Sequence, residues 1–74
     1  MFIRSQDGRE IYNFNRCYRI YCCEEIIYLQ LQVGDRWDDY KIGIYESSER
    51  TEKVFDEIFK SMFLGKKTFV MPKE

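Results

Sequence analysis

The sequence contains no histidine, only three cysteines and a single proline among its 74 residues. Histidine is the usual general base near neutral pH, the usual partner of a nucleophilic serine or cysteine, and the commonest metal ligand. Its absence excludes a Ser-His-Asp triad, a Cys-His pair and most zinc sites. The four glycines are isolated, so a glycine-rich phosphate-binding loop is also missing. We therefore expect a protein that is not an enzyme and that uses no cofactor or metal ion.

The three cysteines, Cys17, Cys22 and Cys23, do not form a recognisable site. They contain no CxxC pair, and adjacent residues on a strand point to opposite faces, which disfavours a Cys22–Cys23 disulfide. Arg16 and Arg19 lie near them in the sequence, but a guanidinium cannot accept a proton from a thiol. An odd number of thiols fits a reducing compartment in which cysteines serve as small apolar side chains. These features predict a cytoplasmic protein.

An excess of one charge and long apolar runs are missing as well. Twelve basic residues against thirteen acidic ones give a formal net charge of −1, whereas nucleic-acid-binding domains usually carry a basic excess. No apolar run approaches the ~20 residues that a membrane span requires. The N-terminal residues do not follow the pattern of a signal peptide. The composition therefore disfavours a nucleic-acid partner and predicts no membrane association.

Aromatic residues, by contrast, are abundant: six Phe, six Tyr and one Trp. Each can bury roughly 150–250 Å². This matters because a domain of this length buries only ~60% of the surface of its unfolded chain. The aromatic content predicts a folded chain, and the length predicts a single domain over residues 1–74.

Alternation of apolar and polar residues predicts an antiparallel sheet before residue 46. The clearest strand is 26–33, and Asp7-Gly8 is a strong hairpin signal. One face of that strand carries Ile27, Leu29, Leu31 and Val33. Other strands are expected at 2–6, 10–14, 17–23 and 41–45, the last with Ile42 and Ile44 facing the core. The connections between them are too short for crossovers, which predicts a meander.

The spacing then changes to that of a helix. Ser47 or Ser48 can act as the N-cap, and Gly65 suits the position just after the C-terminus. The apolar stripe expected to cover the face of strand 26–33 consists of Val54, Phe55, Ile58, Phe59 and Met62. Residues 67–71 allow a short final edge strand, which Pro72 would end. The expected class is α+β: an antiparallel meander of four to six strands with one C-terminal amphipathic helix packed on one face.

The first candidate site is the polar segment 34–40, which carries the only tryptophan. A tryptophan beside an arginine is typical of a protein-binding anchor. Alternatively, Trp37 folds back over the edge of a small core. The candidate partner-binding residues are Arg36, Trp37, Asp38, Asp39 and Tyr40. The aspartates here lack the ligand spacing and the glycine of a calcium-binding loop.

The second candidate site is the face of the sheet that the helix leaves open. Its predicted binding residues are Arg19, Tyr21, Tyr28 and Tyr45, accompanied by Gln30 and Gln32. Such a face can stack bases, or it can pack against a partner or a second copy. It also fits an ordinary solvated sheet, because tyrosine is common in strands. The single cation, Arg19, makes nucleic acid the weakest of these alternatives.

A third candidate is the acidic side of the predicted helix. Its residues are Glu49, Glu52, Asp56 and Glu57, to which Asp35, Asp38, Asp39 and Glu46 add further negative charge. This set could imitate a phosphate backbone towards a basic partner. However, Lys53 and Lys60 form i,i+4 pairs with Glu49 and Asp56, which favours a solvated face.

Three stretches of the chain together resemble a known group of sequences. They are Ile3-Arg4-Ser5-Gln6-Asp7, then Ile42-Gly43-Ile44-Tyr45 followed by Glu49-Arg50 and Val54-Phe55-Asp56-Glu57-Ile58, and finally Phe69-Val70-Met71-Pro72. This pattern is similar to small uncharacterised proteins from Firmicutes genomes and their phages. Phe55 stands where the group has Leu, and residues 13–40 are largely unmatched. No active site is assigned in the group, so no residue roles carry over.

The resemblance implies an accessory factor of a phage or mobile element that binds and occludes a host protein. Inhibition of a bacterial defence nuclease, as by an anti-CRISPR protein, is one such role. The alternative hypothesis is a homo-oligomeric small-ligand, nucleotide-binding or structural assembly protein that uses the tyrosine-rich sheet face. Under the first of these hypotheses, the unmatched segment 13–40, which holds Trp37 and most of the tyrosines, would determine specificity.

Overall fold

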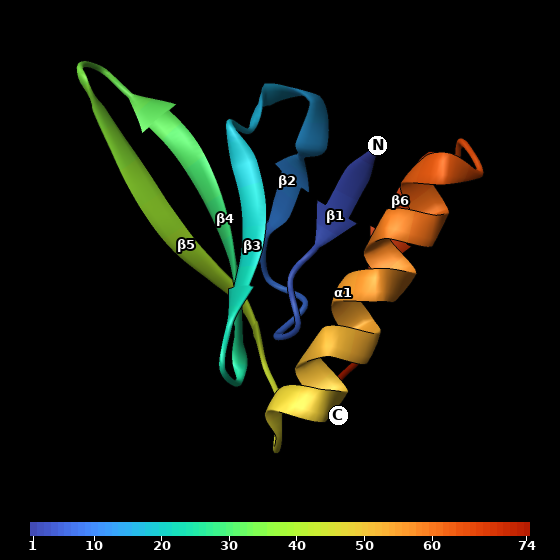
Figure 1. The fold of residues 1–74 in the computed structure, drawn as a ribbon. Helices are drawn as coiled ribbons and strands as arrows, with labels where there is room; N and C mark the ends of the chain where they lie inside the picture. The colour runs from blue at the N-terminus through green and yellow to red at the C-terminus, as the bar shows by residue number, and fades with distance from the viewer.

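In a computed structural model, which describes residues 1–74, the chain forms two three-stranded sheets and one helix (Figure 1). The α+β class predicted from the sequence is therefore confirmed. The elements are β1 (Phe2–Arg4), β2 (Ile11–Asn13), the 3₁₀ turn η1 (Phe14–Arg16), β3 (Arg19–Cys23), β4 (Ile26–Val33), β5 (Arg36–Ile44), α1 (Ser48–Phe63) and β6 (Thr68–Val70).

The first sheet has the order β2-β1-β6. β1 and β2 are antiparallel and are joined by the predicted turn at Asp7-Gly8, where Gly8 has a φ of 74°. The Asp7 carboxylate accepts hydrogen bonds from the Ser5 hydroxyl at 2.6 Å and from the Arg9 N–H at 2.9 Å. β6 is the short edge strand expected near residue 70, and it runs parallel to β1.

The second sheet, β3-β4-β5, is an antiparallel meander. β4 has the bounds expected from the alternation in the sequence, whereas β5 begins at Arg36 rather than at residue 41. A two-residue turn at Gly34-Asp35 joins β4 to β5, with Gly34 at a φ of 63°, a conformation that suits glycine in a tight hairpin.

The expectation of one continuous meander of four to six strands is wrong. The chain leaves β2 through η1, whose N-terminus is capped by the Asn13 side chain accepting from the Asn15 N–H at 3.1 Å. This turn carries the chain away from β2, so β3 starts a separate sheet. β1 therefore remains the central strand of the first sheet, and β6 occupies its other edge.

Gln6 joins the two sheets. Its backbone N–H donates to the carbonyl of Ile42 at 2.9 Å, and its side chain both accepts from the N–H and donates to the carbonyl of Ile44, each at 2.8 Å. The same side-chain amide also donates to the carbonyl of Lys73 at 2.9 Å. Gln6 thus occupies the edge of β5 where another strand would otherwise pair.

A β-bulge changes the direction of the side chains at the end of β5. Ile27 pairs with Gly43 and Tyr28 with Lys41, so Ile42 is the extra residue. Ile42 faces the core as expected, but the next core-facing side chain is Tyr45, and Ile44 is exposed. The prediction that Ile44 is buried is therefore wrong, because one additional residue reverses the alternation.

The helix is capped at both ends. Ser47 is the N-cap and accepts from the Arg50 N–H at 3.1 Å, which decides between the two predicted serines. At the C-terminus, the N–H of Lys66 donates to the carbonyl of Ser61 and the N–H of Gly65 to that of Met62. Gly65 has a φ of 70°. This is the Schellman geometry expected of a glycine at this position.

The helix buries part of the predicted stripe. Val54 and Ile58 are buried as expected and Phe55 packs partly against the core, whereas Phe59 and Met62 are exposed. Thr51 and Ser61 are buried as well, and they were missed because the predicted stripe included only apolar residues. Thr51 can be buried because its hydroxyl donates to the carbonyl of Ser47 at 2.9 Å.

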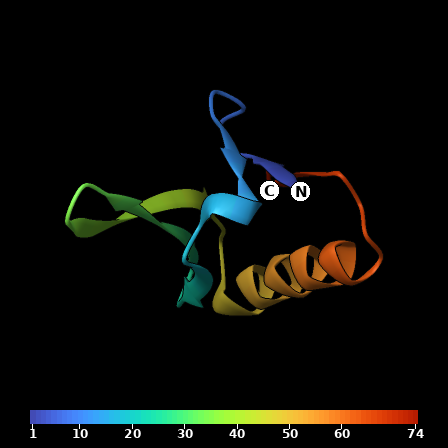
Figure 2. The same ribbon diagram turned by 90° about the horizontal axis from the view of Figure 1, so that it is seen from above.

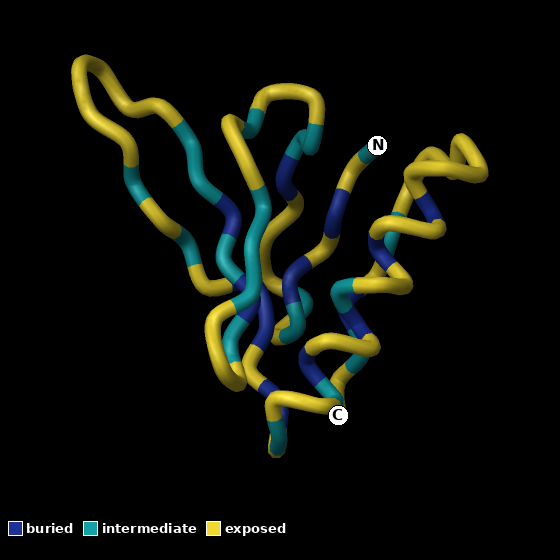
Figure 3. The backbone as a smooth tube through the Cα atoms, in the orientation of Figure 1, coloured by how far each residue is buried: buried dark blue, intermediate teal, exposed yellow.

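The core lies where the helix and the two sheets meet. In Figure 3 the buried segments of β1, β4 and α1 lie toward the middle of the molecule, while the far end of the β4–β5 hairpin is exposed. The core consists of Ile3, Tyr12, Ile27, Leu29, Ile42, Tyr45, Val54, Ile58 and Met71. The helix is not long and apolar enough to cross a membrane.

Candidate binding surface

The β4–β5 hairpin projects beyond the rest of its sheet (Figures 1 and 2). β3 begins at Arg19, which pairs with Gln30, so residues 31–38 have no third strand beside them. In this projection β4 and β5 pair only with each other, and the tight turn at Gly34-Asp35 joins them. The residues around Trp37 therefore form regular strands of a projecting hairpin, although the sequence pattern predicted no strand over residues 34–40.

The predicted anchor residues 36–40 all lie in β5 and are divided between its two faces. Arg36 and Asp38 share one face, where their side chains form an ion pair at 3.1 Å. Tyr40 is on the same face and packs partly against the core, with its ring 5.9 Å from that of Tyr12. Trp37 and Asp39 point to the opposite face, because successive side chains alternate along a strand.

Asp39 connects the first predicted site with the second. Its carboxylate accepts from the Tyr21 hydroxyl at 2.9 Å and from the Gln30 side-chain amide at 2.8 Å. Gln30 in turn accepts from the Arg19 guanidinium at 3.2 Å. We call the surface formed by Tyr18, Arg19, Tyr21, Tyr28, Gln30, Trp37 and Asp39 the polar-aromatic face.

The rings of the polar-aromatic face are already in contact with one another. The Arg19 guanidinium lies 4.3 Å from the centre of the Tyr21 ring, and the rings of Tyr21 and Tyr28 stack at 5.1 Å. Loss of solvent around the phenol and its hydrogen bond to Asp39 raise the pKa of Tyr21. The hydroxyl therefore remains protonated, and a donor to the carboxylate, to a higher pH than an ordinary phenol.

Trp37 pairs with Tyr18 at the open end of this face. Their ring centres are 4.5 Å apart, and the two residues are 48% and 65% exposed, respectively. Trp37 therefore does not fold back over the core. Tyr18 was not among the residues chosen from the sequence, since it precedes β3 and no local pattern indicates its contact with a residue 19 positions later.

Tyr45 does not belong to this surface, and its assignment to the open sheet face is wrong. It is only 4% exposed, and its hydroxyl donates to the carbonyl of Pro72 at 2.9 Å. The bulge at Ile42 turns its side chain into the core. Burial raises the pKa of Tyr45 to about 12.

The three thiols are free. Cys17 is half-buried, and that burial raises the pKa of its thiol, which lowers the fraction of reactive thiolate. Cys23 is exposed at the end of β3. The Cys, Asp and Glu side chains do not gather in groups of three or more that could hold a metal ion.

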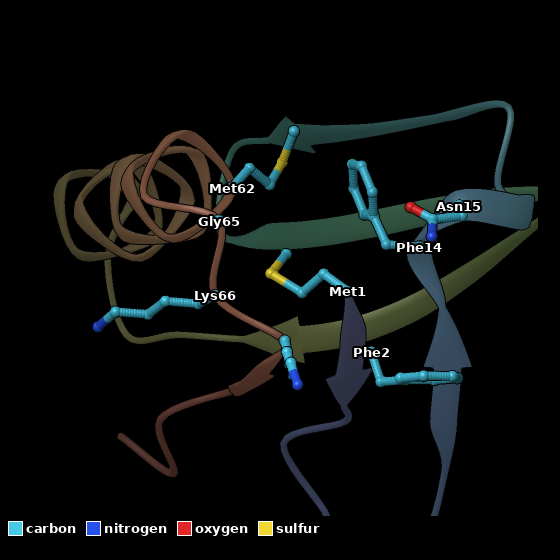
Figure 4. A pocket seen from close by; sticks show the side chains of 8 residues that line it. Met1, Phe2, Phe14, Asn15, Met62, Gly65 and Lys66 are labelled. Carbon is cyan, nitrogen blue, oxygen red and sulfur yellow. The ribbon is translucent and has the colours of Figure 1, made fainter.

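A groove of about 530 Å³ lies between β1, η1 and the C-terminal end of α1. Figure 4 shows Met1, Phe14 and Met62 converging on it, whereas Lys66 points away. The sequence pattern did not indicate this groove, because its walls come from both ends of the chain.

Comparison of the chain with protein-family models, with curated proteins and with solved structures finds no match.

Proposed function

We propose that this protein is a non-enzymatic binding module that recognises another protein through the polar-aromatic face. The observation that carries this proposal is the exposed Tyr18–Trp37 pair on the projecting hairpin. Tryptophan and tyrosine dominate the energetics of many protein interfaces, particularly where polar groups surround them. The pair stands beside a hydrogen-bonded network that already fixes its polar neighbours.

The network favours binding because it lowers the conformational entropy lost on association. Arg19, Gln30 and Asp39 are held by one another before any partner arrives. Each rotamer-rich side chain that is ordered only on binding costs about 0.5–1.5 kcal/mol. A surface that is ordered in advance avoids much of this cost.

A nucleotide or single-strand binder is the weaker alternative. The Tyr21 ring is in contact with both the Arg19 guanidinium and the Tyr28 ring, so it offers a base little free stacking area. The Asp39 carboxylate at the centre of the network would repel a phosphate. These contacts favour a protein partner over a nucleic acid.

The specific form of the proposal is a cytoplasmic accessory factor, encoded by a phage or mobile element, that occludes a surface of a host protein. It rests on the resemblance to the Firmicutes and phage group and on the absence of histidine-based chemistry from the sequence. A defence nuclease is one candidate host protein. The unmatched residues 13–40 of that resemblance include every member of the polar-aromatic face.

Affinity capture from a Firmicutes lysate, followed by mass spectrometry, tests the proposal. We expect Trp37→Ala and Tyr18→Ala to lose a protein that the unchanged chain retains. Ile11→Ala is the matched control, because it truncates an exposed apolar side chain on the other sheet. Retention of the same protein by all three variants would contradict the assignment of this surface, and fluorescence titration with nucleotides would then test the alternative.

A further inference from the structure

The outer edge of β5 is covered along one half and open along the other. β5 is the last strand of the second sheet, so β4 is its only partner in that sheet. Gln6 bonds to the backbone of Ile42 and Ile44 and closes the edge at that end. The half of the edge that lies on the projecting hairpin has no such cover.

The open half begins beside the hairpin turn. The two-residue turn at Gly34-Asp35 makes Val33 and Arg36 a hydrogen-bonded pair. Trp37 and Asp39 therefore occupy the non-hydrogen-bonded positions opposite β4, and their backbone N–H and C=O groups point away from it. A row of unpaired backbone groups on an exposed strand edge is a template on which another strand can pair.

The side chains of the projecting hairpin determine the charge that such a strand should carry. Residues 31–40 contain three carboxylates and one guanidinium. The guanidinium of Arg36 pairs with Asp38, whereas Asp39 accepts two hydrogen bonds but forms no ion pair. A carboxylate has about four acceptor positions, so Asp39 can still accept from a cation. The open half of the edge therefore favours a basic strand.

We propose that an extended, basic segment of the partner protein pairs with the open edge of β5 in the antiparallel sense. This inference rests on the proposed function, since the partner is a protein, and it adds how that partner is held. Trp37 and Asp39 each exchange two backbone hydrogen bonds with the added strand.

The same pairing brings basic side chains onto the polar-aromatic face. Residues directly opposite each other in an antiparallel pair have their side chains on the same face of the sheet. The residues opposite Trp37 and Asp39 therefore stand on the polar-aromatic face, to which both of these side chains point. A basic side chain opposite Asp39 pairs with its carboxylate, and one opposite Trp37 lies against the indole ring.

A second copy of β5 fits this edge poorly. Antiparallel pairing about a twofold axis at Asp38 or at Asp39 sets that carboxylate against its own symmetry mate. An axis nearer the covered half runs into Gln6, and an axis at Trp37 leaves only residues 36–38 paired before the turn. The acidic residues that oppose a second copy are the ones that attract a basic strand.

Two isomeric peptides test the proposal by NMR titration. Each is a capped eight-residue peptide of alternating arginine and valine, N-methylated either on every valine or on every arginine. When the arginines lie opposite Trp37 and Asp39, it is the arginine N–H groups that donate to β5, whereas the valine N–H groups point outward. We expect the valine-methylated peptide to bind with a Kd of the order of 100 µM, and the arginine-methylated peptide at least about tenfold more weakly.

Hydrogen exchange shows whether the bound peptide lies on the edge. The amides of Trp37 and Asp39 should exchange about fivefold more slowly once most of the protein carries the valine-methylated peptide. Asp39→Asn should weaken binding by about fivefold, because it removes the charge that faces the arginine. Asp56→Asn is the matched control, since it neutralises an exposed carboxylate on α1, and it should leave binding unchanged.

Equal binding of the two peptides, a reversed preference, or unchanged exchange at Trp37 and Asp39 would overturn the pairing of a strand with this edge. The proposed function is judged separately, by the loss of lysate capture in Trp37→Ala and Tyr18→Ala. Capture that depends on these two side chains, together with failure of both peptides to bind, would keep the polar-aromatic face as the recognition surface and refute the added strand.

Discussion

At the scale of single residues, Gln6 holds together parts of the chain that are far apart in the sequence. Its side chain bonds to both backbone groups of Ile44 and to the carbonyl of Lys73. We expect Gln6→Ala to lower the free energy of unfolding by about 1–3 kcal/mol, because two carbonyls and one N–H lose their partner. Chemical denaturation followed by circular dichroism measures this change.

Gln6→Glu is the matched variant for that prediction. An ionised carboxylate can accept from the Ile44 N–H, but it cannot donate to the carbonyls of Ile44 and Lys73. Once protonated, it can still accept from the Ile44 N–H and can donate its single O–H to one of the two carbonyls. The variant should therefore gain stability relative to the unchanged chain as the pH falls through the carboxyl pKa. If its stability relative to the unchanged chain did not vary with pH, the bridging role of the side chain would be refuted.

The raised pKa values of two tyrosines predict how the stability of the protein changes at alkaline pH. Burial raises the pKa of Tyr45 to about 12, and burial together with the hydrogen bond to Glu10 raises the pKa of Tyr12 to about 12. In the unfolded chain tyrosine ionises near pH 10. The stability from these two groups is therefore complete below pH 10 and is lost as the pH rises through 12.

Denaturation at pH 9, 10, 11 and 12 checks this alkaline loss. Tyr45→Phe should flatten the fall between pH 10 and 12, although it also removes the bond to the Pro72 carbonyl and lowers stability at all pH values. Tyr18→Phe, at an exposed position, should leave the slope as it is. An equal slope in all three proteins would show that the buried phenols do not cause the loss.

At the scale of elements, the pairing of β5 with β4 predicts an alternating pattern of amide hydrogen exchange along β5. The turn at Gly34-Asp35 makes Val33 and Arg36 a hydrogen-bonded pair, so Arg36, Asp38 and Tyr40 bond to β4. The amides between them, of Trp37 and Asp39, point to the free edge of the sheet. We expect NMR hydrogen exchange to be slow at Asp38 and Tyr40 and fast at Trp37 and Asp39. Uniform protection along β5 would mean that another strand covers this edge.

The helix and the strands also show which elements can be predicted from local sequence patterns. β4 and α1 could be predicted because each contains a long run with one clear period. β5 could not, because its polar residues at 36–39 resemble a loop, yet their partners on β4 hold them extended. Tyr45 was placed on the wrong face because of the bulge at Ile42. The bulge arises from the pairing of β5 with β4, and the alternation of apolar and polar residues in the sequence does not indicate it.

The candidate site was predicted only in part, because local patterns do not show how separate strands pair. Trp37, Asp39, Arg19, Tyr21 and Tyr28 were all chosen from the sequence, but as two separate surfaces. The contacts that unite them run between strands, through Asp39 and Gln30. Residue type and alternation indicate which side chains share a face of one strand, whereas the register between strands decides which of them meet.

At the scale of the whole molecule, the structure separates a framework from a projecting hairpin. Segments from both ends of the chain meet at one junction, where Gln6 bonds to Ile44, Tyr45 to Pro72, and the N–H of Met71 to the carbonyl of Arg4. These contacts place both ends of the chain in the framework of the fold.

The hairpin, by contrast, should be removable. Leu31 and Asp38 face each other two steps before the turn, so they form a hydrogen-bonded pair like Val33 and Arg36. Replacing residues 32–37 with Asn-Gly would close the hairpin at that pair with a turn that suits it. Because the deleted tip contacts the rest of the protein chiefly through Tyr18, we expect the free energy of unfolding to fall by no more than about 1–2 kcal/mol.

Guanidinium denaturation and affinity capture together check this prediction on one variant. The shortened chain should unfold in a single cooperative transition and should fail to retain the partner, since it lacks Trp37. Replacing only the turn residues, Gly34-Asp35, with Asn-Gly is the control and should preserve both stability and capture. A large loss of stability on shortening would show that the hairpin belongs to the framework, and the assignment of recognition to a separate projecting element would then be untenable.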